Sequence, residues 1–183
     1  MRIISGQYGG RRLVSFEAKH LRPTTDRTKE SIFSKIAELI PQARVLDLFA
    51  GTGSLGLEAL SRGADHVDFV ESHRKSLKII KQNIQLLDIQ SDCYQVHFMD
   101  VFKYLKAYSG PAYQIIFADP PFTEKIADRV GQAVGSSSVG RAGSIWMMES
   151  GGAELVGETY GPWQLMDRRD FGDKVVSFFG LSD

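Results

Sequence analysis

The chain has 183 residues, of which 43% are hydrophobic, so a disordered chain is excluded and one compact domain is expected. The formal net charge is zero, which excludes a uniformly basic surface. The charge is uneven, however. Residues 1–35 carry eight Lys or Arg and three Asp or Glu, a net charge of +5, so the rest of the chain carries −5. Such asymmetry favours an end that faces a polyanion, although a solvated basic surface would give the same composition.

The cysteine content and the apolar runs bear on the cellular compartment. Cys93 is the single cysteine, so an internal disulfide or a cysteine-cluster metal site cannot form. No apolar run approaches the about 20 residues needed to span a membrane, and the first residues lack the apolar stretch of a signal peptide. We expect a cytoplasmic, monomeric protein that holds no metal.

The first 40 residues predict a small basic unit. Residues 2–5 and 11–14 alternate loosely around a Gly-Gly pair, which predicts a short β-hairpin. Thr24 or Thr25 is placed to cap a helix that runs to about Ile40. Several basic side chains of this unit are candidates for phosphate contacts. They are Arg11, Arg12, Arg22, Arg27 and Lys29.

From residue 44 onward, short apolar runs alternate with stretches of helical periodicity. This pattern predicts an α/β fold, a doubly wound, mostly parallel and Rossmann-like sheet of seven strands. A short turn joins the last two runs and predicts a hairpin that inserts one antiparallel strand. The predicted units are therefore residues 1–40 and an α/β domain of residues 41–183. Strands are expected at 45–49, 66–70, 95–98, 114–118, 144–148, 163–169 and 174–179, and helices at 54–62, 73–87, 101–108 and 124–134.

A glycine-rich turn follows the first strand of the α/β domain. Gly51 and Gly53 lack a Cβ and let the backbone approach a ligand closely. Together with Gly56 they spell the G-x-G-x-x-G pattern of dinucleotide-binding turns, which taken alone would suit NAD equally well. Phe49 belongs to the same turn and is a further candidate for contact with the cofactor.

Acidic residues stand at the ends of three successive strands. Asp47 closes the first strand, Glu71 the second, and Asp100 follows the third. Ligands of open α/β sheets bind beyond these carboxyl ends. S-adenosylmethionine offers an ammonium group, a ribose and an adenine amino group, each of which needs an acceptor, whereas the pyrophosphate of NAD disfavours nearby negative charge. The three acids therefore favour S-adenosylmethionine, although any one of them could simply cap a helix.

The fourth strand runs into Asp119-Pro120-Pro121-Phe122. The prolines stop the strand and restrict the residues before them to extended geometry. The Asp119 carboxylate and the Pro120 carbonyl can then both accept hydrogen bonds from one amino group, and Phe122 can stack on a flat base. Two acceptors of this kind stabilise the positive charge that develops on an exocyclic amine as it is methylated. A loop with a capping aspartate would have the same sequence.

The two motifs at residues 47–53 and 119–122 resemble those of amino-group N-methyltransferases. The N-terminal half is more specific, because it resembles the bacterial family that methylates guanine N2 in 16S ribosomal RNA. The resemblance covers the whole chain in order and is weakest at residues 135–160. The segments that carry it are Arg-Pro-Thr-Thr-Asp-Arg-Thr-Lys-Glu-Ser-Ile-Phe at 22–33, Ile-Ser-Gly at 4–6, Gly-Arg-Arg-Leu at 10–13 and Ala-Leu-Ser-Arg-Gly-Ala at 59–64.

The resemblance implies a class I methyltransferase fold, S-adenosylmethionine as the donor and a guanine of small-subunit ribosomal RNA as the target. The partner would be 16S ribosomal RNA, within a small subunit or an assembly intermediate, and the basic N-terminal residues would contact the RNA. Methylation of DNA adenine or of another RNA is the main alternative, since both bases present an amino group. An NAD-dependent oxidoreductase and an RNA-binding module without catalysis are the remaining ones.

Overall fold

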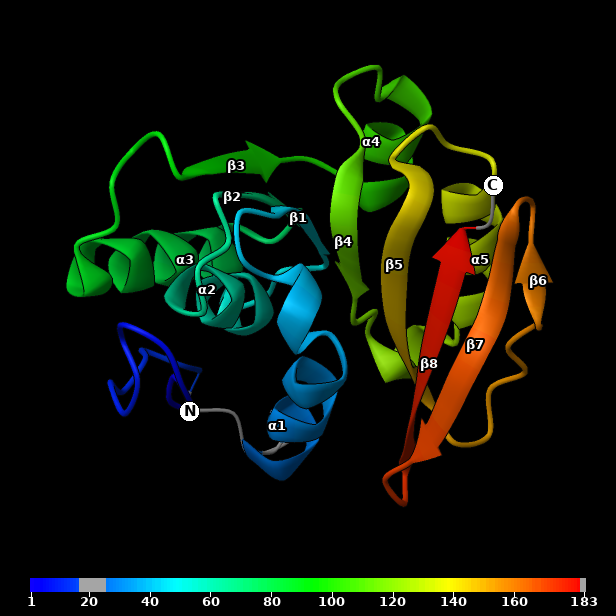
Figure 1. Cartoon of the computed structure of the whole chain (residues 1–183), viewed down its shortest axis with the longest axis horizontal. Coiled ribbons are helices and arrows are strands. Elements are labelled where there is room, and N and C mark those ends of the chain that lie inside the picture. Colours follow the sequence, from blue (N-terminus) through cyan, green and yellow to red (C-terminus); the bar gives the residue numbers. More distant parts are fainter. Residues whose placement is uncertain (17–25, 182–183) are drawn as a thin grey trace.

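The computed structural model describes residues 1–16 and 26–181, and its strands form one mixed sheet in the order β3-β2-β1-β4-β5-β8-β7-β6 (Figure 1). The strands are β1 (Arg44–Leu48), β2 (His66–Glu71), β3 (Tyr94–Phe98), β4 (Tyr113–Ala118), β5 (Gly140–Gly151), β6 (Thr159–Tyr160), β7 (Trp163–Asp170) and β8 (Lys174–Leu181). The α-helices are α1 (Asp26–Lys35), α2 (Ser54–Ser61), α3 (Arg74–Leu87), α4 (Val101–Ala107) and α5 (Ala127–Gly135), with short 3-10 helices η1 (Ala37–Leu39) and η2 (Phe122–Glu124).

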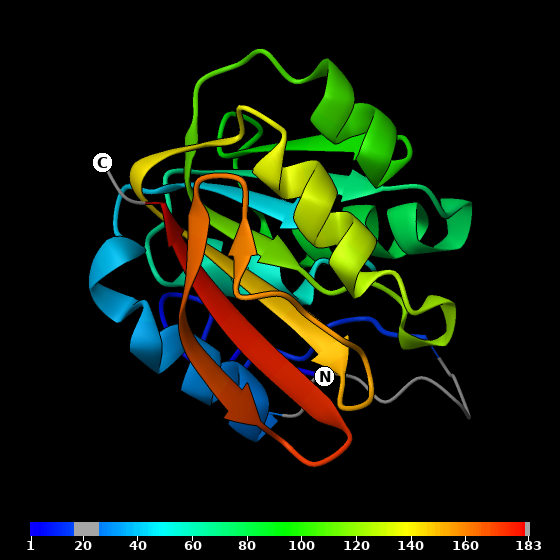
Figure 2. The same ribbon diagram turned by 90° about the vertical axis from the view of Figure 1, so that its right-hand side faces the viewer.

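The strand directions confirm the predicted doubly wound sheet. Strands β1 to β5 pair in parallel, and β8 lies antiparallel between β5 and β7 (Figure 2). The predicted antiparallel insertion is therefore present. The sheet has one strand more than the seven expected, because the two residues of β6 pair with the start of β7 at its edge. A strand this short gives no alternation from which it could be predicted.

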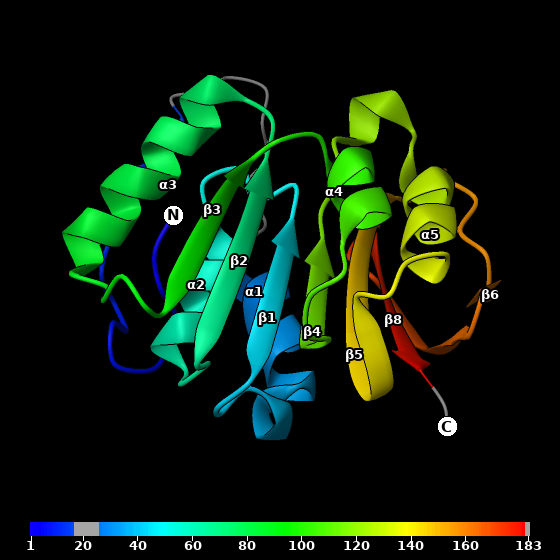
Figure 3. The ribbon, with the colours of Figure 1, turned by 90° about the horizontal axis from the view of Figure 1, so that it is seen from above.

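Helices cover both faces of the sheet, as Figure 3 shows from above. Side chains of α1, α2 and α3 share one buried apolar cluster with one face of the central strands, and those of α4 and α5 share a second cluster with the other face. In the second cluster Trp146 of β5 stacks on Phe179 of β8 with ring centroids 4.5 Å apart. This contact fixes β8 beside β5.

The N-terminal segment is docked on α2 rather than extended from it. Ile3 is fully buried, and its backbone N–H donates to the carbonyl of Arg11 (2.9 Å). The expected hairpin is reduced to one isolated bridge, between Arg2 and Arg12. Gly6 has φ +85°, and a Cβ there would lie 1.8 Å from the carbonyl oxygen of Ser61, so only glycine fits this approach.

The N-terminal helix is shorter than predicted. The candidate caps Thr24 and Thr25 lie outside the described residues, and α1 ends at Lys35 instead of continuing to Ile40. The chain turns at Ile36 (φ −109°, ψ 12°) and forms η1. Buried apolar side chains of residues 1–16 and 26–40 join the same cluster as β1 and α2, so these two segments share the core of the α/β domain. Within the described parts of the chain, no helix is long and apolar enough to cross a membrane.

Candidate active site

The topology brings the predicted acids to one edge of the sheet. Because β1 to β4 are parallel neighbours, their carboxyl ends meet at the same edge. Asp47 lies next to the end of β1, Glu71 ends β2, Asp100 is two residues past β3, and Asp119 follows β4 directly. Strand β4 is hydrogen-bonded to β1, which places the Asp-Pro-Pro-Phe segment beside the glycine-rich turn.

The glycine-rich turn has a strained backbone. Phe49 (φ +59°), Gly51 (φ +57°) and Gly53 (φ +79°) all occupy the left-handed region, and Phe49 does so with a side chain. Strain of this kind concentrates at ligand-binding segments. Among the described residues, only the Phe49 carbonyl oxygen, at 3.8 Å, would lie within 4 Å of a Cβ on Gly51, so no described side chain crowds this backbone. Gly56 serves packing instead, since a Cβ there would lie 2.3 Å from the ring of Phe69.

Asp47 is buried under the glycine-rich turn and stabilises it. Its side chain is only 2% exposed, and its Oδ2 accepts a 2.9 Å hydrogen bond from the backbone N–H of Gly56 in α2. Burial raises the pKa of Asp47 to about 7; the hydrogen bond from Gly56 opposes this rise and the charge of Glu71 adds to it. A cation bound nearby would favour the ionised form. The low exposure indicates that Asp47 acts mainly through the turn.

Glu71 links the end of β2 to the same turn. Its Oε2 accepts from the backbone N–H of Gly51 (2.8 Å), and its Oε1 accepts from the backbone N–H of His73 (2.7 Å). The side chain is 7% exposed, so the carboxylate is nearly enclosed yet lies directly behind the open backbone of Gly51. Each oxygen has a second lone pair that a ligand hydroxyl can use.

Asp100 is exposed and caps α4, its Oδ1 accepting from the backbone N–H of Lys103 (3.0 Å). The two residues before it are apolar and partly exposed, Phe98 at 49% and Met99 at 36%. Sequence reasoning missed these side chains as a candidate apolar surface for a flat ligand. They could have been predicted from the sequence, because two apolar residues at the end of a strand directly precede the acid.

An aromatic contact joins the turn to α4. Phe49 lies edge-on to Phe102 at 6.5 Å between centroids, and the guanidinium of Arg129 lies 4.0 Å from the Phe102 centroid. Phe102 was also missed. Sequence position alone does not show that this helix faces the turn.

The Asp-Pro-Pro-Phe segment leaves β4 as an ordered loop. Asp119 is half-buried and Pro120 is buried. Pro121 has extended geometry (φ −63°, ψ 119°), and its carbonyl accepts from the backbone N–H of Glu124 (3.1 Å) to close η2. Phe122 begins η2 with a half-buried ring. This ordered loop therefore places both Asp119 and Phe122 at the carboxyl edge of the sheet.

The basic N-terminal candidates have different environments. Arg11, Arg12 and Arg27 are exposed. The guanidinium of Arg11 donates to the carbonyl of Leu86 near the end of α3 (3.0 Å). Arg22 lies outside the described residues.

The prediction that Lys29 contacts phosphate is wrong. Its side chain is 1% exposed, and its Nζ pairs with Glu58 (3.1 Å) and donates to the carbonyl of Arg2 (2.6 Å). Burial lowers the pKa of Lys29, while the neighbouring Glu58 opposes that effect. Lys29 shares a helix face with the buried Ile32 and Phe33, three and four residues on, so it points into the core.

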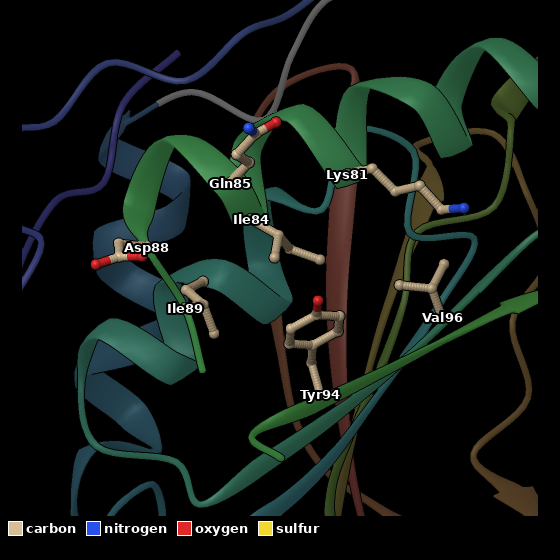
Figure 4. Close-up of a pocket in the computed structure, with 7 residues that line it drawn as sticks. All are labelled: Lys81, Ile84, Gln85, Asp88, Ile89, Tyr94 and Val96. Carbon is tan, nitrogen blue, oxygen red and sulfur yellow. The ribbon is translucent and has the colours of Figure 1, made fainter. Parts of the chain in front are cut away.

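A separate groove of about 500 Å³ lies between α3 and β3 (Figure 4). Tyr94 points from β3 toward Ile84 of α3, and Lys81, Gln85 and Asp88 line the groove from the helix side and its end. None of its lining residues is a predicted site residue. Groups of three or more His, Cys, Asp or Glu able to hold a metal ion do not occur in residues 1–16 and 26–181.

Comparisons with known proteins agree with this arrangement. Residues 1–180 match the model of the family described as "Conserved hypothetical protein 95". The chain is 42% identical over 127 residues to the "Putative rRNA methyltransferase YlbH" of Bacillus subtilis, covering 68% of each chain. It is 39% identical over 130 residues to the "Ribosomal RNA small subunit methyltransferase D" of Haemophilus influenzae, covering 70% of this chain and 67% of the relative.

Solved structures share this fold. A putative methyltransferase, yhhF, from Escherichia coli is 30% identical with a TM-score of 0.87, and the match covers 100% of this chain and 98% of that one. SMU.776, a putative methyltransferase solved in complex with SAH, is 15% identical with a TM-score of 0.69, covering 87% and 51% of the two chains, which shows likeness of fold alone. The chain therefore belongs to the "Conserved hypothetical protein 95" family and is related to the ribosomal RNA small subunit methyltransferases D.

Proposed function

We propose that this chain transfers a methyl group from S-adenosylmethionine to the exocyclic N2 of a guanine in 16S ribosomal RNA. One observation carries the proposal: parallel pairing of β1 with β2 and with β4 sets Glu71, the open turn at Gly51 and the Asp119 loop side by side at one edge. The relatives named as ribosomal RNA small subunit methyltransferases support the choice of substrate.

The donor set of this edge suits S-adenosylmethionine. Glu71 would accept from the ribose hydroxyls, and Asp100 from the adenine amino group. Asp47, through the turn, would favour the ammonium group. Phe49, Gly51 and Gly53 would supply the backbone that lies against the cofactor, whose role is to offer an electrophilic methyl group. The room that the described residues leave beside Gly51 fits such a ligand. The fold neighbour SMU.776 was solved in complex with SAH, which supports this choice.

The loop after β4 would receive the base. Asp119 and the Pro120 carbonyl would each accept a hydrogen bond from the amino group, so the nitrogen lone pair is directed toward the methyl group. As the N–C bond forms and the S–C bond of the donor breaks, the nitrogen would lose one proton, which the Asp119 carboxylate would take. Phe122 would stack on the purine. The base must leave any stack to reach this loop, and a base in an RNA loop does so at least cost. A chemical step that needs neither a metal nor a covalent nucleophile fits these residues.

The RNA would be held by the exposed arginines of the N-terminal segment, Arg11, Arg12 and Arg27, together with Arg22. Hydrogen bonds through α3 connect this segment to the glycine-rich turn. Asn83 of α3 donates both to the carbonyl of Val14 and to that of Thr52, each at 3.0 Å. RNA bound by the segment would therefore lie near the turn. Recognition within a small subunit or an assembly intermediate, a monomeric state and a cytoplasmic location stay predictions.

Transfer of a radiolabelled methyl group to small ribosomal subunits from methylation-deficient cells tests the function. Nucleoside mass spectrometry of the product should show N2-methylguanosine in the 16S RNA. Labelled N6-methyladenine in DNA would favour the alternative substrate. Cofactor binding without transfer to either would favour an RNA-binding module without catalysis, and binding of NAD in place of S-adenosylhomocysteine would favour an oxidoreductase.

A further inference from the structure

A buried ion pair lies beside Phe122, the residue proposed to stack on the target base. Lys174, the first residue of β8, pairs with Glu149 near the end of β5. The ammonium of Lys174 lies 4.5 Å from the centroid of the Phe122 ring. Glu149 is fully buried and Lys174 is 8% exposed.

The register of the sheet creates this pair. Gly151 faces Lys174 and Glu149 faces Val176 across the antiparallel β5–β8 ladder, so Lys174 and Glu149 are diagonal neighbours on one face. The ladder also brings the start of β8 to the carboxyl end of β5. The ammonium thereby reaches the loop that follows β4, in which the ring of Phe122 lies.

Packing alone does not require a charged pair here. The neighbours on the same face, Met147, Val176 and Phe178, are apolar and buried. Removing two charges from water costs several kcal/mol per ion, and apolar residues of similar size often replace such pairs without loss of stability. A buried pair at the edge of a site therefore calls for a role beyond stability.

Phe122 is the group that such a pair can serve. None of the three residues of η2 is buried, so packing around this short turn fixes its first ring only weakly. A cation over one face of an aromatic ring is attracted by the negative face of the ring and restrains it. With Lys174 on one face of the ring, the target base would stack on the other face.

We propose that Lys174 is a positioning residue for Phe122, and that Glu149 fixes the Lys174 ammonium for this purpose. The pair holds the ring in the orientation that stacks on the target guanine before RNA arrives. Direct contact of Lys174 with phosphate is disfavoured by its low exposure. This inference rests on the proposed role of Phe122 in capturing the base.

The test compares the parent protein with the double variant Lys174→Met/Glu149→Gln, which replaces the pair by neutral side chains of similar length. Each is made with Phe122 and with Phe122→Leu. The KM for methylation-deficient small subunits and kcat are measured, with S-adenosylhomocysteine affinity by calorimetry and the thermal midpoint as checks. Glu149→Gln alone is a milder second variant, and Lys174→Arg is the conservative one.

The matched control is Lys35→Met/Asp167→Asn. Like Lys174, Lys35 pairs with a carboxylate, here that of Asp167 (2.9 Å), and lies near an aromatic ring, 5.5 Å from the Phe178 centroid. This pair joins α1 to β7 and does not contact η2. It should leave the KM unchanged.

We expect the double variant to raise the KM for RNA by about 3- to 10-fold, as the loss of one partly desolvated cation–ring contact implies. Glu149→Gln should give a smaller rise, Lys174→Arg should restore most of the affinity, and cofactor affinity should stay within about twofold of that of the parent. In the Phe122→Leu background the double variant should add no further rise.

Two results would overturn the inference: a wild-type KM in the double variant, or the same additional rise with Leu at position 122. If Phe122→Leu itself leaves the KM unchanged, the proposed role of Phe122 fails, which is a separate outcome. If the double variant does not fold, Glu149→Gln in the two backgrounds decides by the same comparison.

Discussion

The carboxylate of Glu71 accepts a 2.8 Å hydrogen bond from the backbone N–H of Gly51. The group proposed to bind the ribose therefore also shapes the turn proposed to lie against the rest of the cofactor. Because the second oxygen of Glu71 holds the N–H of His73, the carboxylate is fixed in position before a ligand binds. Preorganisation of this kind lowers the ordering cost of binding.

Replacing Glu71 should weaken cofactor binding. We expect Glu71→Ala to cost about 1–3 kcal/mol of S-adenosylhomocysteine affinity by calorimetry, because two backbone donors and the ribose lose an ionised acceptor. The affinity of Glu71→Gln should lie between those of the wild type and Glu71→Ala. The matched control is Glu154→Gln, since Glu154 also accepts from two backbone N–H groups, those of Gly151 and Ala127. Unchanged affinity in Glu71→Ala would contradict the assignment.

Replacing Asp119 should separate chemistry from cofactor binding. Asp119→Ala should lower kcat by about 100-fold or more, since an acceptor that stabilises developing charge is lost. Affinity for S-adenosylhomocysteine should change by less than about twofold. Asp119→Asn, which keeps one acceptor oxygen, should retain more activity. An equal loss of cofactor affinity and turnover would instead show that the loop is structural.

The parallel sheet could be predicted because its central strands are buried on both faces and read as continuous apolar runs, such as Val45–Leu48 around Asp47. The acids could be predicted because parallel strands end at one edge. The side of a helix that faces the core does not follow from charge alone. Lys29 was assigned to the RNA-facing surface because it is basic, although its spacing to Ile32 and Phe33 places it on the buried face of the helix. The Lys174–Glu149 pair depends on strand register between segments 25 residues apart, which composition and periodicity do not specify.

Asp47 gives the stability a pH dependence of known sign. Burial raises the pKa of Asp47 to about 7, above its unfolded value, so the folded protein binds the proton more tightly. Stability from this group is present at low pH and is lost as the pH rises from about 4 to 7. Asp47→Asn keeps an oxygen acceptor for Gly56 but cannot ionise.

Denaturant titration at each pH gives the free energy of unfolding of the two cofactor-free proteins. Between pH 4 and pH 8 the value for the wild type should therefore fall relative to that of Asp47→Asn by an amount on the order of 2–4 kcal/mol. Parallel pH profiles for the two proteins would contradict the raised pKa. In the wild type, S-adenosylhomocysteine should bind more tightly as Asp47 ionises, and this pH dependence should be absent from the variant.

Lys29 should behave as a core residue. Lys29→Met leaves the buried Glu58 with Arg62 (2.8 Å) and two backbone N–H groups but without its second cation, so the unfolding free energy should fall by about 2–4 kcal/mol. The salt dependence of RNA binding should not change. Arg27→Met, an exposed position on the same helix, should leave stability within about 0.5 kcal/mol of wild type. Equal stability of the two variants would refute the buried pairing.

Arg11 and Arg12 carry the proposed RNA contact of the N-terminal segment. Lys and Arg that contact phosphates release bound counterions, so RNA binding should weaken as salt rises. We expect Arg11→Glu/Arg12→Glu to raise the RNA concentration needed for half-maximal rate without changing cofactor affinity. The slope of log affinity against log salt should become shallower by somewhat under one unit for each lost contact.

The control for this charge change is Arg141→Glu. Arg141 is exposed near the start of β5, at the edge of the sheet opposite the candidate site, so reversal there alters the net charge without touching the proposed RNA surface. If Arg141→Glu weakens RNA binding as much per charge as the N-terminal reversal does, the effect is one of net charge. If the N-terminal variant keeps the wild-type affinity and salt slope, the basic segment is a solvated surface, and the RNA must be held by other residues.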